Sequence, residues 1–141
     1  MRYVLDCSVA VRWFVPQPHA PRALALLELI RERKVEVIAP DVIVPEFGHV
    51  LRKLAVGRTI KHEQAQTFFD RFLDMNVPQV PSLPLSRAAL RLALAHMGTF
   101  WDALYVALAV ENDLEVVAAD EPMTKAFAPL ERTIHLANLE L

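Results

Sequence analysis

Glycine is scarce in this chain: only Gly48, Gly57 and Gly98 occur, and they lie far apart. Loops that cradle phosphate groups depend on clustered glycines, so the fingerprints of P-loop and dinucleotide-binding proteins are absent. ATP and NAD are therefore not expected as ligands.

Cysteine is scarcer still, with Cys7 as the single example, so no disulfide can form within the chain. This agrees with a reducing compartment. The longest unbroken apolar run, from Ala103 to Val110, is too short to cross a bilayer. Asp6 and Arg12 interrupt the apolar stretch that a signal peptide would need. We therefore expect a soluble, cytoplasmic protein with no membrane partner.

Neither sign of charge dominates, because 15 basic and 17 acidic side chains leave a formal net charge of -2. A protein that holds nucleic acid by bulk charge would be basic. The net charge does not exclude an enzyme acting on nucleic acid, because several acids gathered in one site lower the net charge of the whole chain. The 141 residues, 54% hydrophobic and 23% charged, suit one globular domain covering residues 1–141.

Short apolar runs alternate with amphipathic segments along the chain. Strands are expected at Tyr3–Leu5, Val35–Ala39, Leu114–Ala119 and Thr133–Leu136, with a weak edge strand at Val77–Pro81. Helices are expected at Val9–Val15, Arg22–Arg33, Asp41 to about Ala55, Ile60–Asp74, Ser86 to about Gly98, Thr99 to Asn112 and Met123–Phe127.

Polar residues mark the expected helix ends. Asp41, Ser86 and Thr99 can each cap the start of a helix, and Gly57 can end one. Strands that alternate with helices pair in parallel through right-handed crossovers. The sequence therefore predicts an α/β fold, a three-layer α/β/α sandwich with a mainly parallel central sheet.

Four acids occupy related places in this pattern. Asp6 and Asp120 each end a strand, while Glu46 and Asp102 lie early in helices that follow strands. In an open α/β sheet, strand ends and the starts of the following helices meet at the carboxyl edge, where such folds place their sites. We expect the four carboxylates to converge there.

Converging carboxylates repel one another, and burial adds a desolvation cost. A divalent cation removes that cost, and oxygen-only ligands suit a hard ion such as Mg²⁺ or Mn²⁺. Such an ion polarises a phosphoryl oxygen and lowers the pKa of bound water. The chemistry this indicates is phosphodiester hydrolysis.

Each acid also has an ordinary structural explanation. Asp6 could begin a turn, and Asp102 could be the acid of a capping box. Asp120 could interact with the dipole of the next helix, and Glu46 could be a solvated helix residue. Their shared position at one edge favours a common site.

The segments YVLDCSVAVRWF, APDVIVPEFGHVLRKL, FWDALYVALA and VVAADEPM resemble, in order and spacing, the PIN-domain ribonucleases, and most of all the VapC-type toxins of toxin–antitoxin pairs. The resemblance implies that Asp6, Glu46, Asp102 and Asp120 bind Mg²⁺ or Mn²⁺, with Ser8 as a supporting hydroxyl. It also implies an RNA substrate, a VapB-type antitoxin whose tail enters the groove, and a homodimer.

One position departs from the family pattern. Ala118 stands where the family often has Thr or Ser, two residues before its last Asp, and the missing hydroxyl could weaken the positioning of water or metal. Arg12 and Lys53 could be solvated charges; as a hypothesis, they contact RNA phosphates near the acids. Tyr105 shares a helical face with Asp102 and is assigned to the core.

The function predicted from these features is a Mg²⁺-dependent endoribonuclease, the toxin of a VapBC-type system. Two alternatives stay open. One is a PIN-like module that has lost catalysis and only binds RNA or protein. The other is a receiver-type phosphoacceptor domain, although such domains need a lysine at the end of a late strand and the corresponding strand here reads RTIHL.

Overall fold

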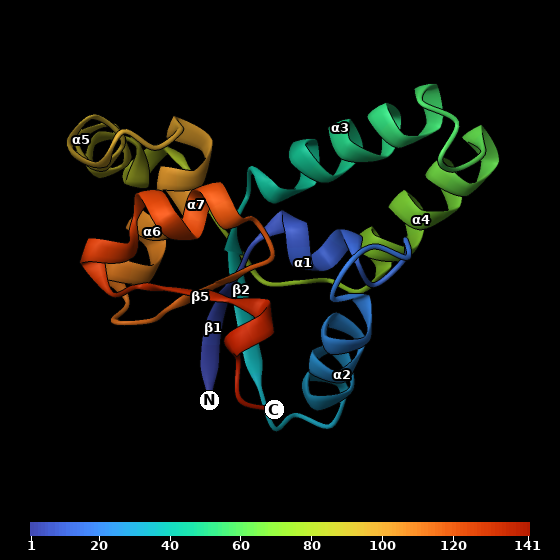
Figure 1. Ribbon diagram of the computed structural model, residues 1–141, viewed down its shortest axis with the longest axis horizontal. Coiled ribbons are helices and arrows are strands. Elements are labelled where there is room, and N and C mark those ends of the chain that lie inside the picture. Colours follow the sequence, from blue (N-terminus) through green and yellow to red (C-terminus); the bar gives the residue numbers. More distant parts are fainter.

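Five short parallel strands form one sheet in the computed structural model, which describes all 141 residues (Figure 1). The strand order is β3-β2-β1-β4-β5. The strands are β1 (Arg2–Leu5), β2 (Glu36–Pro40), β3 (Gln79–Val80), β4 (Val116–Ala118) and β5 (Thr133–His135). At the centre, Val4 pairs with Ile38 of β2 and with Val116 of β4. Buried β-branched residues in β1, β2 and β4 favour strand over helix for these segments.

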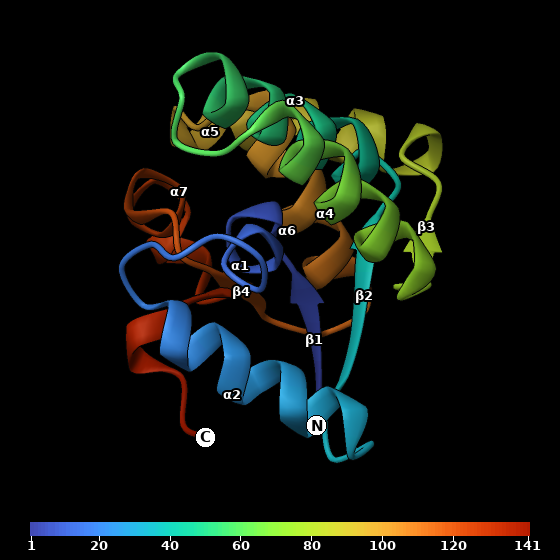
Figure 2. The same cartoon turned by 90° about the vertical axis from the view of Figure 1, so that its right-hand side faces the viewer.

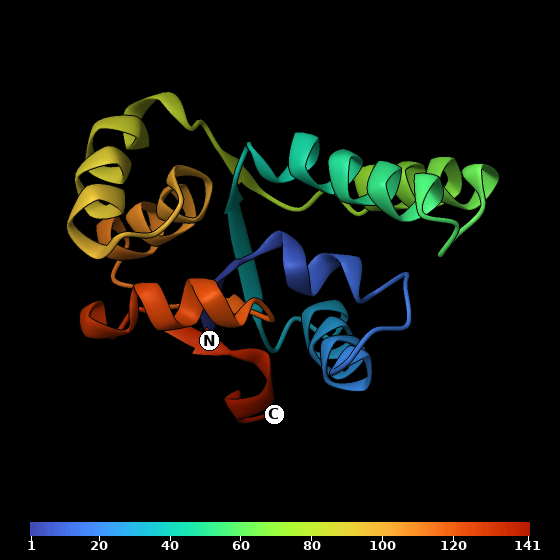
Figure 3. The ribbon, with the colours of Figure 1, turned by 45° about the horizontal axis from the view of Figure 1, so that its top comes forward.

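Helices cover both faces of the sheet, with α1 to α4 on one side and α5 to α7 on the other (Figures 1 and 3). They are α1 (Cys7–Val11), α2 (Ala20–Arg31), α3 (Ile43–Val56), α4 (His62–Asp74), α5 (Ser86–His96), α6 (Phe100–Glu111) and α7 (Glu121–Ala126). Three single-turn 3₁₀ helices complete the chain, at Leu83–Leu85, Ala128–Leu130 and Leu136–Asn138. The predicted three-layer α/β/α sandwich is confirmed.

The strand order reverses direction at β1. The chain moves from β1 outward to β2 and β3, then crosses back to β4 on the other side of β1. Right-handed crossovers in opposite directions place the two helical layers on opposite faces. The carboxyl ends of β1 and β4 therefore border the crevice where open α/β sheets bind ligands.

Helix α6 lies at the heart of the core, because every residue from Ala103 to Ala109 is buried. It packs against β1, β2 and β4 on one side and against α5 on the other. No single helix is long and apolar enough to cross a membrane; only the bent pair Leu83–His96 and Phe100–Glu111, which meet at 114°, reaches that length and composition together.

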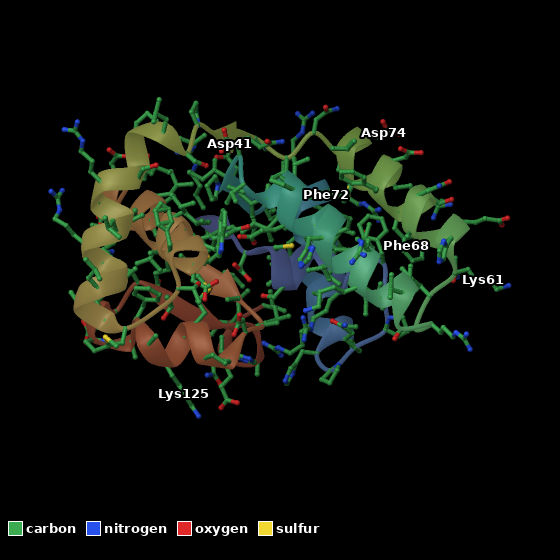
Figure 4. All side chains as sticks on the ribbon, turned by 90° about the horizontal axis from the view of Figure 1, so that it is seen from above. Asp41, Lys61, Phe68, Phe72, Asp74 and Lys125 are labelled. Atoms are coloured by element: carbon green, nitrogen blue, oxygen red, sulfur yellow. The ribbon has the colours of Figure 1, made fainter.

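Helices α3 and α4 lie antiparallel and side by side (Figure 2). Aromatic rings hold them together: Phe72 of α4 stacks on Phe47 of α3 with ring centroids 4.3 Å apart. Phe68, one turn earlier, contacts Phe14 at 5.6 Å. Figure 4 shows Phe68 and Phe72 turned toward α3, while Lys61 and Asp74 mark the two exposed ends of α4. This packing fixes α3, which carries one of the predicted site residues.

The predicted helix caps were right at Thr99 and wrong at two other positions. Thr99 Oγ1 accepts a hydrogen bond from the Asp102 backbone N–H at 3.1 Å, which starts α6. Asp41 does not cap α3; its carboxylate accepts from the backbone N–H (3.1 Å) and the hydroxyl of Ser82 instead. Ser86 does not cap α5 either, because its hydroxyl donates back to the Ser82 carbonyl. Both side chains tie down the loop after β3.

Several predicted boundaries also shift by a few residues, among them those of the first and fifth helices. The first helix begins at Cys7, directly after Asp6, and ends at Val11 rather than Val15. Helix α5 ends at His96 because Met97 takes a left-handed conformation (φ 56°). Gly98 is needed for space: a Cβ there would lie 2.4 Å from Cζ of the buried Phe127 ring. The edge strand predicted at 77–81 is present as β3.

Candidate active site

A pocket of about 820 Å³ opens at the carboxyl edge of the sheet. All four predicted carboxylates line it, from four separate segments of the chain: Asp6, Glu46, Asp102 and Asp120. The three supporting residues Ser8, Arg12 and Lys53 line the same pocket. The structure therefore brings together all seven residues that the sequence singled out.

A second pocket of similar size, about 810 Å³, lies near the opposite edge of the sheet, where β1 and β2 begin. Arg2, Arg31 and Arg33 contribute its charges, and Glu36 is its only acid. It therefore has no group of carboxylates, and the chemistry considered below belongs to the pocket at the carboxyl edge.

Asp6 is placed by the end of β1 and the start of α1. Its backbone N–H still donates to the Val117 carbonyl of β4 at 3.1 Å, so the residue is anchored to the sheet. Its side chain caps α1 by accepting from the Ser8 backbone N–H at 3.0 Å. Asp6 is only 4% exposed and is the one buried charged residue of the chain. A carboxylate buried in this way needs compensation from its surroundings.

Ser8 links Asp6 to the end of β4. Its hydroxyl donates to Asp6 Oδ2 and accepts from the Ala119 backbone N–H, the latter at 2.8 Å. Ala118, where the family often has a hydroxyl, is fully buried in β4. In this chain the hydroxyl next to the end of β4 is therefore that of Ser8.

Glu46 lies one turn into α3 and is half-buried. The Tyr105 hydroxyl, from the buried face of α6, donates to Glu46 Oε2 at 3.0 Å. The other carboxylate oxygen, Oε1, is buried and has no hydrogen-bond partner in the protein. An unpaired buried acceptor of this kind is rare and costly unless a ligand satisfies it.

Asp102 and Asp120 are held at helix N-termini. Asp102 lies in the first turn of α6, after the Thr99 cap. Asp120 is the N-cap of α7, and its Oδ1 accepts from the Met123 backbone N–H at 3.3 Å. Asp120 thus caps a helix and lines the pocket as well, whereas α6 is capped by Thr99 and no backbone hydrogen bond from Thr99 to the Asp102 carboxylate completes a capping box.

Burial and mutual repulsion shift the pKa values of these acids upward. Burial, with smaller contributions from Asp102 and Asp120, raises the pKa of Asp6 to about 6, even though hydrogen bonds from Ser8 act in the opposite direction. Burial and the charge of Asp6 raise the pKa of Glu46 to about 7, against the Tyr105 hydrogen bond. The pKa of Asp102 is raised by burial and by Asp120. The pocket thus disfavours negative charge that has no cationic partner.

The two basic side chains of the pocket, Arg12 and Lys53, differ in whether the protein already occupies their hydrogen-bond donors. The Arg12 guanidinium donates to the carbonyls of Ser8 (2.6 Å) and Pro18 (2.7 Å), which pins α1 to the loop before α2. Burial lowers its pKa, although Asp6 and Asp120 oppose this. Lys53 is exposed and lies two turns beyond Glu46 on the same face of α3, so its ammonium is free to meet a ligand.

The donor set of the pocket suits a hard divalent cation. Its charged acceptors are carboxylate oxygens, one of which has no protein partner, and burial together with repulsion from neighbouring acids raises the pKa of Asp6 and of Glu46. As the side chains lie, no three His, Cys, Asp or Glu residues form a ready-made metal site. The oxygens of Asp6, Glu46 and Asp120 are instead turned toward Ser8, Tyr105 and the backbone of α7.

Two residues of the pocket have more to do than the sequence suggested. Tyr105 was assigned to the core, and it is fully buried, but its hydroxyl also orients Glu46. Its position three residues after Asp102, on the same helical face, was the available signal. Trp101 received no role, yet it lines the pocket and is 60% exposed. Trp101 stands out from the core aromatic residues only by its solvent exposure, which the sequence alone does not reveal.

Known proteins resemble this chain in sequence and in fold. The PIN domain family matches residues 3–126. Ribonuclease VapC1 from two strains of Mycobacterium tuberculosis is 35% identical over 91 residues, which are 62% of this chain and 65% of that protein. The match thus spans slightly less than two thirds of the relative's length.

Two crystal structures share the architecture. PAE2754 from Pyrobaculum aerophilum superposes with a TM-score of 0.69 at 21% identity, covering 97% of this chain and 85% of that one. VapBC2 from Rickettsia felis, bound to a DNA fragment from their promoter, has a TM-score of 0.67 at 17% identity, covering 96% and 97%. At these identities the likeness concerns the fold. Because the sequence match covers residues 3–126 of 141, this chain belongs to the PIN domain family.

Proposed function

We propose that this protein is an endoribonuclease that depends on Mg²⁺ or Mn²⁺ and acts as the toxin of a VapBC-type pair. The observation that carries the proposal is the convergence of Asp6, Glu46, Asp102 and Asp120 in one pocket, where burial and mutual repulsion raise the pKa values of three of them. A structure held together by its core does not need four acids in one crevice. A divalent cation removes the repulsion and gives the arrangement a use.

The residues of the chain divide the work around a phosphodiester. When bound, the ion supplies a positive charge that polarises the phosphoryl group and eases ionisation of water. Asp6, Glu46, Asp102 and Asp120 would hold it. Ser8 and Tyr105 keep two of these carboxylates in place through hydrogen bonds.

The proton of the attacking water needs an acceptor within the pocket. The carboxylate oxygens that line the pocket can accept it, and Glu46 Oε1 is the one that has no protein partner. The raised pKa of Glu46 belongs to the pocket without an ion, because a bound cation would favour the ionised carboxylate. Lys53, exposed at the margin, offers a cation for a neighbouring phosphate of the substrate.

The similarity to ribonuclease VapC1 supports RNA as the substrate and the toxin assignment, over the part of the chain that it covers. The neighbouring VapBC2 structure is that of a complex, which supports a VapB-type antitoxin as partner. A cytoplasmic location and a homodimer complete the proposal; the single cysteine agrees with the former.

The proposal is tested by cleavage of single-stranded RNA with and without Mg²⁺. Asp6→Asn and Asp102→Asn should each lower kcat by at least about 100-fold, the scale of losing a group that acts on the reacting atoms, while circular dichroism shows an unchanged fold. Excess EDTA should abolish activity of the wild-type protein, and Mg²⁺ or Mn²⁺ should restore it.

Asp74→Asn is the matched control, because Asp74 is an exposed acid at the far end of α4 and its side chain makes no hydrogen bond (Figure 4). It should cleave like the wild type. Full activity of Asp6→Asn, or of the wild type in EDTA, would overturn the proposal. A protein that binds RNA but never cleaves it would instead favour the non-catalytic PIN-like module.

A further inference from the structure

The two tryptophans of the chain are in opposite situations. Trp13 is 8% exposed, and its Nε1 donates to the Ala23 carbonyl at 3.0 Å, so it belongs to the core. Trp101 is 60% exposed and lines the carboxylate pocket next to Asp102. A large aromatic ring left in water beside a cluster of acids contributes little to folding. Because the ring lines the pocket, a ligand held there can contact it.

The local structure fixes where this ring can be. Trp101 is the second residue of α6, two positions before the fully buried stretch 103–109. Phe100 packs against the core and meets the Trp101 ring edge-on, with centroids 6.2 Å apart and an interplanar angle of 70°. The ring is therefore supported from one side and presents its remaining surface outward.

Cationic, acidic and aromatic side chains line the pocket from different segments of the chain. Arg12, directly after α1, and Lys53, on α3, supply the cations, and the carboxylates lie on the segments around them. Trp101, at the start of α6, is the pocket's only aromatic ring apart from the imidazole of His49. It also lines an adjoining hollow with Asp41 and Ser82, so its surface continues beyond the carboxylates.

We propose that Trp101 is a stacking platform for an unpaired base of the RNA, next to the phosphate that is cleaved. The inference rests on the proposed nuclease function and adds a requirement on the substrate. Aromatic side chains bind bases that are not already stacked, and they do so with little regard to base identity. The stacked position should thus require an unpaired base and show little preference for which base it is.

Tryptophan fluorescence tests this directly, because Trp13 is buried and Trp101 is exposed. The inactive Asp6→Asn protein with Mg²⁺ is titrated with a single-stranded oligoribonucleotide of about ten nucleotides, within the usual site size. We expect saturable quenching of the emission, and much weaker quenching by the same sequence annealed to its complement. With Trp101→Phe added, only Trp13 emits, and RNA should leave that emission unchanged.

Affinity measured by an independent method gives the magnitude. Adding Trp101→Ala should weaken binding of the single strand by about 5- to 150-fold, the range measured for loss of one stacked base. Trp101→Phe keeps a ring and should stay within about fivefold of its parent. Val110→Ala, an exposed apolar residue at the other end of α6 that does not line the pocket, should bind unchanged. In the active protein, Trp101→Ala should raise KM more than it lowers kcat.

The outcomes separate this inference from the nuclease proposal. If the wild type cleaves RNA while Trp101→Ala binds and cleaves equally well, the stacking platform is wrong and the nuclease stands. If RNA quenches Trp101 but no preparation cleaves it, the nuclease is wrong and the platform stands as a binding site. If the emission changes on dilution without RNA, a second copy of the chain covers Trp101, and the platform is wrong.

Discussion

Removing the negative charge of Asp6 should stabilise the metal-free protein at neutral pH, and the structure gives the size of the effect. The pKa of Asp6 rises from the ordinary 3.8 to about 6, chiefly because the side chain is buried. The folded state therefore holds the proton more tightly than the unfolded state. Its stability must fall as the pH rises from about 4 to about 7. At 1.36 kcal/mol per unit of pKa, the loss is roughly 3 kcal/mol.

Asp6→Asn removes this penalty but keeps an oxygen that can accept from the Ser8 backbone N–H. Urea unfolding in EDTA should show equal stability of variant and wild type near pH 4. At pH 7.5 the variant should be more stable by about 3 kcal/mol, or about 10 °C in Tm. Saturating Mg²⁺ should stabilise the wild type, by about 2.7 kcal/mol at 100 times Kd, and the variant by less. Asp74→Asn changes an exposed acid outside the pocket, so this variant should match the wild type in its stability at both pH values and in its stabilisation by Mg²⁺.

The reasoning would be refuted by a variant that is no more stable than the wild type at pH 7.5 in EDTA. That result would mean that folding does not raise the free energy of ionising Asp6. Equal stabilisation of both proteins by Mg²⁺ would separately show that Asp6 does not take part in binding the ion.

Three further predictions concern neighbouring residues. Tyr105→Phe should lower stability at pH 8 by about 1–3 kcal/mol, because Glu46 loses its only protein donor; Tyr3→Phe, which loses only a contact with a methionine sulfur, is the control in the same urea titration. Lys53→Glu should weaken RNA binding at low salt and reduce the salt slope by about one, whereas Lys34→Glu, outside the pocket, should do neither. Gly98→Ala should cost about 1–3 kcal/mol in thermal unfolding, because the added Cβ meets the buried Phe127 ring; wild-type stability would show that this ring can move aside.

The architecture was predictable because it follows from periodicity and topology. Buried β-branched runs alternate with amphipathic segments, and that pattern allows few arrangements besides a parallel sheet between two helical layers. The convergence of Asp6, Glu46, Asp102 and Asp120 followed from the same rule, since strand ends and helix starts share one edge. The resemblance to the PIN domain family is confirmed by the match over residues 3–126.

What failed were details that depend on three-dimensional neighbours. Asp41 and Ser86 have the right chemistry for caps, but the loop after β3 competes for their hydrogen bonds, and that contact spans 41 residues in the case of Asp41 and Ser82. The hydroxyl of Tyr105 reaches Glu46 across 59 residues of sequence. Neither contact has a local signature. The roles of the site residues remain predictions for the experiments above.

The order in which the sheet is assembled has a consequence for the cell that makes this protein. Strand β4 is synthesised fourth but lies beside β1, and it brings Asp120 to a place that Asp6 has marked since the beginning of translation. The pocket therefore cannot close around all four carboxylates until the segment that carries Asp120 has left the ribosome. Shorter nascent fragments would carry some of the carboxylates without the finished site, so the proposed cleavage of RNA would require β4 to be in place beside β1.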